Sequence, residues 1–271
     1  MKVKKYLPSI ITLANLFLGF LSILYIQKGN YSLACHLILI AALLDSFDGK
    51  LARKIGVVSS FGKEIDSLAD VVSFCLSPSF LVFNILYNSS LIRDNAEFFF
   101  IYIALISSFP VLMGAIRLAR FNVEHDDEGA KSFYVGLPSP MSAISICSII
   151  LLKLNLLNKL YDINSDELNF LTFNIILPII ILLSFLMISK IQFSKFPLFS
   201  FSMGKINSIR LILMLISIIV MIISSFMNYL HITLFLFSAY YILSNISFHF
   251  INNSIRLNQL REKIKNKRRG V

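Results

Sequence analysis

Two closely spaced pairs of aspartates are the residues of this sequence best suited to chemistry. Asp45 and Asp48 are three residues apart, and Asp66 and Asp70 are four residues apart. On a helix, either spacing places both carboxylates on one face, one turn from each other. If one membrane helix ends with the first pair and the next begins with the second, a short turn aims all four side chains into one space. We therefore expect one acidic cluster at a membrane surface.

Such a cluster requires compensating positive charge. An unpaired Asp at mid-membrane costs about 2.5–3.5 kcal/mol on insertion scales, and neighbouring carboxylates repel each other further. Two divalent ions would cancel the formal charge of four carboxylates, and all-oxygen ligation suits Mg²⁺ or Mn²⁺. The predicted ligands of these two ions are Asp45, Asp48, Asp66 and Asp70. The alternative, four aspartates solvated in a loop, leaves the matched helical spacings unexplained.

The neighbours of the aspartates suit a ligand that carries phosphate. Small residues beside the acidic ones would let a bulky ligand reach the helix backbone, and an arginine offers a planar fork to phosphate oxygens. These neighbours are Gly49, Ala52, Arg53 and Gly62. Divalent metal, a guanidinium and an anionic substrate within one or two turns are the layout of a phosphoryl-type displacement.

The composition indicates that membrane helices carry these residues. The chain is 56% hydrophobic with a mean hydropathy of +0.76, above the roughly 45–50% apolar usage of soluble domains. Several stretches approach the length of about 20 apolar residues that a helix needs to cross a bilayer. We expect an all-α polytopic bundle of about eight membrane helices, at 8–27, 31–53, 64–87, 97–121, 138–155, 169–189, 208–228 and 231–251. Pro178, inside the sixth, is a candidate kink.

The basic residues predict the orientation of this bundle. With eight helices both termini lie on one side, and that side receives 21 of the 25 lysines and arginines. The positive-inside rule then places both termini, and the aspartates, at the cytoplasmic face. The basic residues of the other side are Lys28, Arg93, Lys153 and Lys159.

We expect one membrane domain with a C-terminal addition: a six-helix core at 1–190, a two-helix membrane extension at 191–251 and a basic cytoplasmic tail at 252–271. The net charge of +10 is dispersed over loops. Topology and attraction to anionic lipid explain it more simply than nucleic acid does, so membrane lipids are expected partners and nucleic acid is not. The tail is either a solvated helix end or disordered segment, or it contacts anionic lipid.

The spacing around the aspartates resembles the signature of the CDP-alcohol phosphatidyltransferase family. The pattern reads Asp45-x2-Asp48-Gly49-x2-Ala52-Arg53-x8-Gly62-x3-Asp66-x3-Asp70, without gap or substitution. The resemblance implies that a CDP-linked lipid is coupled to a small alcohol with release of CMP. It implies that the first three aspartates ligate the metals that hold the CDP pyrophosphate, while Asp70 completes the site and acts as general base. Gly49, Ala52, Arg53 and Gly62 would pack against the cytidine nucleotide, and a homodimer is expected.

Further segments resemble the phosphatidylserine synthases of bacteria and archaea and favour L-serine as the acceptor, with CDP-diacylglycerol as the donor. These segments are 7–17, 66–74, 117–122 and 136–140, and the resemblance covers roughly residues 7–190. One departure is Ser9, where that subfamily commonly has Asn. The resemblance places the active site at the cytoplasmic face of a prokaryotic inner membrane. Glycerol 3-phosphate or inositol phosphate as the acceptor is the alternative within the family.

A serine pocket should contain a cation for the serine carboxylate. Arg117 and Arg120 are one turn apart at the cytoplasmic end of the fourth expected helix, and we expect at least one of them to bind substrate. The alternative is a pair of positive-inside anchors. Asn15 is a candidate for contact with phosphate or serine, with helix packing as its alternative.

A divalent-cation transporter is the competing function of a different class, because intramembrane carboxylates can also pass metal. A transporter predicts acidic residues at mid-depth on several helices, around a central site. Here the acidic residues collect at one membrane face, and Arg53 beside them would repel a cation. The enzyme is therefore the favoured interpretation.

Overall fold

The computed structural model describes residues 7–55, 60–88, 96–124, 133–159, 172–194 and 205–268, and it is mainly helical. Helices long and apolar enough to cross a membrane are Pro8–Gln27, Tyr31–Gly49, Ser60–Tyr87, Phe99–Val123 and Leu230–Ile251. Shorter apolar helices are Ser139–Asn155, Asn174–Ile188 and Leu215–Phe226. Each expected membrane helix overlaps one of these, and their lengths and composition are those of an integral membrane protein.

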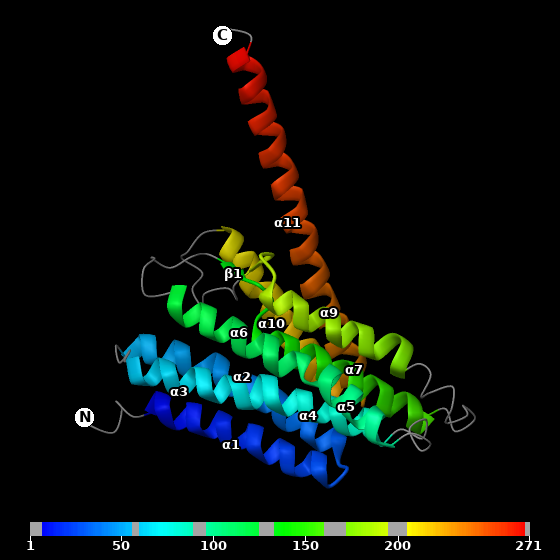
Figure 1. Ribbon diagram of the computed structural model, residues 1–271. Coiled ribbons are helices and arrows are strands. Elements are labelled where there is room, and N and C mark those ends of the chain that lie inside the picture. The colour runs from blue at the N-terminus through cyan, green and yellow to red at the C-terminus, as the bar shows by residue number, and fades with distance from the viewer. Residues whose placement is uncertain are drawn as a thin grey trace.

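The N-terminal part of the chain forms a bundle of helices that lie side by side (Figure 1). α1 (Leu7–Gln27) and α2 (Tyr31–Ile55) form a hairpin. Gly29 in its turn has φ +75°, which glycine adopts without steric cost. The next helical run comprises α3 (Ser60–Asp70), the π-helical segment η2 (Val71–Leu76) and α4 (Ser77–Tyr87).

Two prolines mark interruptions in the expected helices. The fourth expected helix divides into α5 (Ala96–Ser107) and α6 (Phe109–Glu124). Pro110 has no N–H for the preceding turn and its ring crowds that turn, which explains the break. Pro178 stands in the first turn of α9 (Leu177–Ile188), directly after the π-helical η4 (Thr172–Ile176). Asn174–Ile188 is one apolar helix, so Pro178 lies where its π-helical turn changes to α-helical turns, and the kink stays a prediction. Residues 169–171 of the expected sixth helix lie outside the described residues.

A short antiparallel ribbon departs from the all-α prediction. β1 (Phe133–Val135) pairs with β2 (Gln192–Ser194), and Tyr134 lies opposite Phe193. Three-residue strands are too short for a readable alternation of polar and apolar residues. They are also far apart in the sequence, so no hairpin signal marks them.

The C-terminal helices are α10 (Lys205–Phe226) and α11 (Leu230–Arg268). α11 packs on α7 (Ser139–Lys159), crosses the bundle obliquely and projects beyond it (Figure 1). The eighth helix was expected to end at residue 251, but the structure continues it through the basic stretch to Arg268. This corrects the disordered alternative for residues 252–268. The side chains of that stretch, and residues 269–271, lie outside the described part of the chain.

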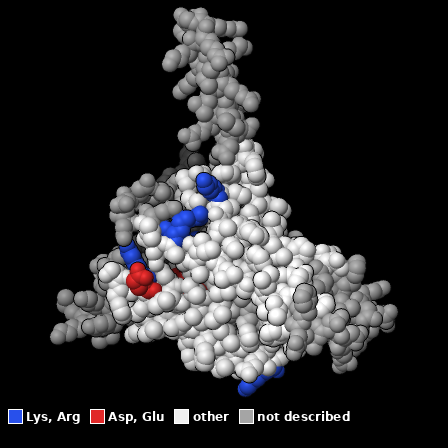
Figure 2. All heavy atoms as spheres, viewed as in Figure 1, with Lys and Arg blue, Asp and Glu red and all other residues white. Residues whose placement is uncertain are grey.

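The surface of the bundle is largely apolar. Figure 2 shows charged side chains gathered mainly near one end of the face in view, with a wide uncharged area beside them. Phe17, Leu43 and Leu105 are each more than half exposed, as expected for contact with lipid chains. The interior packs closely around η2, because a Cβ on Gly19 would meet Ser73 and a Cβ on Gly114 would meet Cys75.

Candidate functional site

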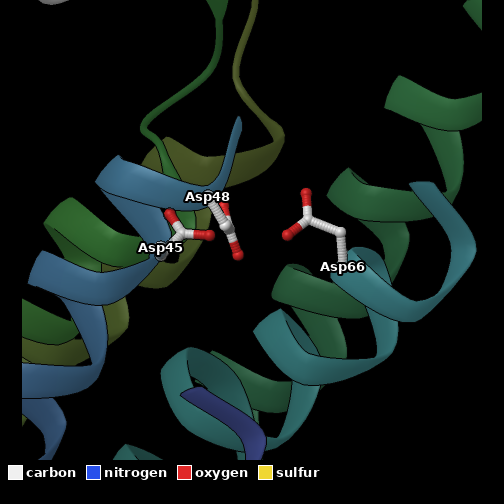
Figure 3. Close-up of side chains that lie close together, drawn as sticks. All are labelled: Asp45, Asp48 and Asp66. Atoms are coloured by element: carbon white, nitrogen blue, oxygen red, sulfur yellow. The ribbon is translucent and has the colours of Figure 1, made fainter. Parts of the chain in front are cut away.

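Three of the four aspartates converge between α2 and α3 (Figure 3). Asp45 and Asp48 extend from α2 toward Asp66 on the facing helix α3. One carboxylate oxygen from each lies within 4.8 Å of the other two. We call these three residues the acidic triad. Their approach follows from the helical spacing, because residues three apart share a face of α2.

The acidic triad fits a hard divalent cation. Three carboxylates this close repel one another unless a positive charge offsets them, and oxygen ligands suit Mg²⁺ or Mn²⁺. Asp66 Oδ1 is buried and has no hydrogen-bond partner among the described residues. Buried polar atoms normally have a partner, so an atom of this kind within the triad is suited to a ligand.

Thr12, on α1, is a residue of the site that the sequence did not single out. Its hydroxyl donates to Asp48 Oδ2 at 2.9 Å and lies 3.1 Å from the carbonyl oxygen of Pro8. Both side chains are buried, Thr12 at 5% and Asp48 at 3% exposure. Partners of this kind orient metal-binding carboxylates. The available signal was the three-residue spacing to Asn15, which places both side chains on one face of the first helix.

Asp70 lies beside the acidic triad rather than within it. Ser139 Oγ, at the start of α7, donates to Asp70 Oδ2 at 3.4 Å and accepts a hydrogen bond from Arg117 Nη1 at 3.2 Å. Asp70 Oδ1 is buried and has no partner among the described residues. One oxygen of Asp70 is thus held by a hydroxyl, while the other is available. Ser139 belongs to a segment that carried the serine-synthase resemblance, but the sequence assigned it no role.

The two candidate arginines of α6 have different surroundings. Arg117 is 6% exposed, and its Nε has no hydrogen-bond partner among the described residues. Arg120 donates to the carbonyl oxygens of Ile188 at 3.2 Å and Val135 at 3.3 Å. Arg120 therefore ties the end of α9 to β1. Arg117 retains a donor beside Ser139.

Asn15, the third candidate for the acceptor pocket, is fully buried on α1. Neither polar atom of its side chain has a partner among the described residues. Its backbone carbonyl accepts a hydrogen bond from Ser73 at 3.0 Å, which joins α1 to η2. A buried amide without hydrogen bonds costs about 1–3 kcal/mol, so packing alone does not explain this residue.

The residues expected against the nucleotide are only partly described. A Cβ on Gly49 would meet no atom of the described residues within 4 Å, so among these residues open space adjoins α2 directly after Asp48. Gly62 lies in the first turn of α3 and is half-buried. Ala52 and Arg53 belong to the last turns of α2, but their side chains lie outside the described part of the chain.

Two irregular backbone elements adjoin the residues beside the triad. Asp70 is the last residue before η2, and π-helical turns are frequent at functional sites. Ser139 follows a turn at Gly136, where φ is +80° and a Cβ would meet the carbonyl oxygen of Met187. Only glycine suits that turn, because it combines a left-handed backbone with close approach of a carbonyl group.

Comparisons with known proteins give one consistent family. A family model described as CDP-alcohol phosphatidyltransferase matches residues 5–240. A CDP-diacylglycerol–serine O-phosphatidyltransferase of Helicobacter pylori is 34% identical over 190 residues, covering 70% of this chain and 72% of that protein. A Bacillus subtilis protein of the same name is 34% identical over 194 residues, covering 70% of this chain and 91% of that protein. An archaetidylserine synthase of Methanothermobacter thermautotrophicus is 40% identical over 147 residues, covering 54% and 58% of the two chains.

Proposed function

We propose an activity from one premise: the chain belongs to the CDP-alcohol phosphatidyltransferase family. Within this family, the protein transfers the phosphatidyl group of CDP-diacylglycerol to the hydroxyl of L-serine and releases CMP. The observation that carries the proposal is the acidic triad with Asp70 beside it. The relatives named for transfer to serine support the acceptor.

The acidic triad is proposed to hold the divalent metal, Mg²⁺ or Mn²⁺, and the charge of the motif favours two ions. When bound, the metal neutralises the pyrophosphate of the CDP-lipid and stabilises CMP as the leaving group. The protein keeps three carboxylates together, with Thr12 orienting Asp48. Open space beside Gly49 leaves room for the nucleotide. The proposed nucleotide contacts are Gly49, Ala52, Arg53 and Gly62.

Asp70 is proposed as the general base. Its Oδ1 has no partner among the described residues, while its Oδ2 accepts from Ser139. As the serine hydroxyl gives its proton to Asp70, the serine oxygen attacks the phosphorus that bears diacylglycerol. The bond between that phosphorus and the oxygen of CMP then breaks, so the proton and the leaving group are both accounted for. General bases of this kind contribute about 10²–10⁴-fold in rate.

Arg117 is the proposed partner of the serine carboxylate. Its Nε is buried without a partner among the described residues, and its Nη1 donates to Ser139, which also contacts the proposed base. A carboxylate bound there would satisfy the open donor of a guanidinium. Arg120 already donates to two backbone carbonyls, so we assign it to the scaffold of the pocket. The buried amide of Asn15 is proposed to contact phosphate or serine.

The arrangement in the membrane belongs to the same proposal. We place the eight helices in a prokaryotic inner membrane with both termini and the active site at the cytoplasmic face. The excess of basic residues on that side supports this orientation. The core is 1–190, followed by the extension 191–251 and the basic stretch 252–271. A homodimer, implied by the family resemblance, is proposed as the assembly.

The acceptor is tested by incubating purified protein with CDP-diacylglycerol, Mn²⁺ and one alcohol at a time. We expect phosphatidylserine and CMP in equal amounts from serine, and little product from glycerol 3-phosphate or inositol phosphate. Robust use of either phosphate, without serine incorporation, would reject the serine assignment and keep the family chemistry. A protein whose acceptor carries a phosphate would require a cluster of cations, and Arg117 offers one guanidinium at the described site.

A further inference from the structure

The C-terminal helix holds one strand of the β1–β2 ribbon from the side. Tyr241 donates to the carbonyl oxygen of Ser194 at 3.0 Å, and Asn245 Oδ1 accepts from the N–H of Ser194 at 2.8 Å. One turn further along, His249 Nδ1 accepts from the N–H of Gln192 at 3.3 Å. The ring of Tyr241 also stacks on the fully buried Phe193, with centroids 6.0 Å apart. Residues 241, 245 and 249 thus lie on one face of α11 and hydrogen-bond to the backbone of β2, and we call them the α11 clamp.

The ribbon that the α11 clamp holds leads directly to the site. β2 pairs with β1, and Gly136, which follows β1, donates its N–H to Ile191 at 2.8 Å. Leu137 N–H then donates to Leu186 at 2.9 Å, and Arg120 holds Val135 from the other side. Ser139 follows two residues later. The strand and the turn are therefore held by hydrogen bonds as far as Leu137, and the chain itself connects them to Ser139 at the start of α7.

We infer that Tyr241 and Asn245 are positioning residues for the acceptor side of the reaction, acting through the ribbon on Ser139. This inference rests on the proposed function, in which Ser139 contacts both Asp70 and Arg117. The acidic triad comes from α2 and α3, whereas α11 packs mainly on α7, α10 and β2. Loosening the α11 clamp therefore affects binding of serine more than binding of CDP-diacylglycerol. All three clamp residues lie beyond residue 240, where the family match ends.

The test uses substitutions in the full-length protein that remove the side-chain hydrogen bonds to Ser194. Tyr241→Phe removes the donor to Ser194 and keeps the stacked ring. Asn245→Ala removes the acceptor together with the donor bond from Asn245 Nδ2 to the carbonyl oxygen of Tyr241. Asn245→Asp restores only the acceptor oxygen. The matched control is Tyr240→Phe, which loses the same hydroxyl from a neighbouring residue that is 71% exposed. For each protein, KM is measured for serine and for CDP-diacylglycerol, and hydrogen exchange is followed at the amides of Ser194 and Gly136.

We expect Tyr241→Phe and Asn245→Ala to raise the KM for serine by about three- to tenfold, the range of one lost hydrogen bond. The KM for CDP-diacylglycerol should stay within twofold, both amides should exchange faster, and Asn245→Asp should recover at least part of the effect. A wild-type KM for serine in both Tyr241→Phe and Asn245→Ala would overturn the inference. An equal rise in the KM for serine and the KM for CDP-diacylglycerol would also overturn it. If the wild type itself does not use serine, the proposed function fails. The hydrogen-exchange rates then test, without any activity, whether the α11 clamp acts on the turn at Gly136. Exchange at the Gly136 amide that is the same in the variants as in the wild type would reject that link.

Discussion

The Thr12 hydroxyl, 2.9 Å from Asp48 Oδ2, restricts how that carboxylate can turn. Ser139 does the same for Asp70 Oδ2. At the scale of residues, the spacing of the aspartates was sufficient to predict a common acidic site, because helical periodicity converts three- and four-residue steps into one face. The hydroxyl partners could not be predicted in this way. They come from α1 and α7, and only the packing of those helices brings them to the carboxylates.

Replacing Thr12 with valine should weaken metal binding without removing a ligand. Thr12→Val keeps the shape of the side chain and deletes the donor to Asp48. Loss of a partner that orients a ligand typically costs about 10–100-fold in metal affinity or activity. We expect the Mn²⁺ concentration for half-maximal activity to rise at least tenfold, with near-native turnover at saturating Mn²⁺.

The control for Thr12→Val is Ser46→Ala. Ser46 lies next to Asp45 on α2 but donates to the carbonyl oxygen of Ala42 in its own helix. Its Mn²⁺ titration should match that of the wild type. If Thr12→Val also titrates like the wild type, the hydroxyl does not orient the ligand.

At the scale of elements, the site depends on irregular backbone as well as on regular helices. Hydrophobic length predicted the helices, since a membrane helix is readable from its apolar run. The π-helical turns at η2 and η4 and the β1–β2 ribbon were not predicted. They are too short for the spacing of their apolar residues to indicate a type of secondary structure. The turn at Gly136 is the clearest case. Its positive φ and the approach of Met187 are set by tertiary contacts.

Two glycine substitutions should separate folding from binding. At Gly136→Ala, the new Cβ would meet the carbonyl oxygen of Met187 at a left-handed φ, so we expect destabilisation by more than about 1 kcal/mol. At Gly49→Ala, no atom of the described part of the chain lies within 4 Å of the new Cβ, so the fold should be unaffected while CDP-diacylglycerol binds more weakly.

Thermal unfolding in detergent and the KM for CDP-diacylglycerol together measure both effects. A lower melting temperature for Gly136→Ala alone, and a higher KM for Gly49→Ala, are the expected results. A Gly49→Ala protein with a native KM would remove this position from the proposed nucleotide contacts.

At the scale of the whole molecule, the apolar runs predict a polytopic protein, and the basic residues predict that its acidic site lies at the cytoplasmic face. The number of described helices that meet the length for a membrane span is smaller than the number expected, because the described apolar parts of the fifth, sixth and seventh expected helices are shorter: Ser139–Asn155, Asn174–Ile188 and Leu215–Phe226. The obliquity of α11 and its continuation to Arg268 were not predictable, since helix direction is set by packing on α7. Its basic C-terminal stretch does contain apolar residues at helical spacing, Leu257, Leu260 and Ile264, a signal that the prediction of a membrane helix ending at residue 251 did not use.

The proposed orientation predicts which introduced cysteines react from outside the cell. Lys28→Cys lies in the turn between α1 and α2, and Met227→Cys lies in the turn between α10 and α11; both positions are exposed. Lys190→Cys is exposed near the ribbon. A membrane-impermeant maleimide should label the first two in intact cells and the third only after permeabilisation. The native thiols give a low background because all three are buried, and the opposite labelling pattern would invert the topology.

The central claim is that Asp45, Asp48 and Asp66 bind the metal while Asp70 acts as the general base. Two substitutions of aspartate by asparagine, measured in parallel, test it most directly. Mn²⁺ binding, CDP-diacylglycerol binding and serine transfer would be measured for purified Asp70→Asn and Asp45→Asn proteins. We predict that Asp70→Asn loses at least about 10²-fold in turnover but keeps most of its Mn²⁺ and lipid-nucleotide binding, whereas Asp45→Asn loses both binding and turnover. Near-native turnover in Asp70→Asn, or native Mn²⁺ binding in Asp45→Asn, would contradict the account.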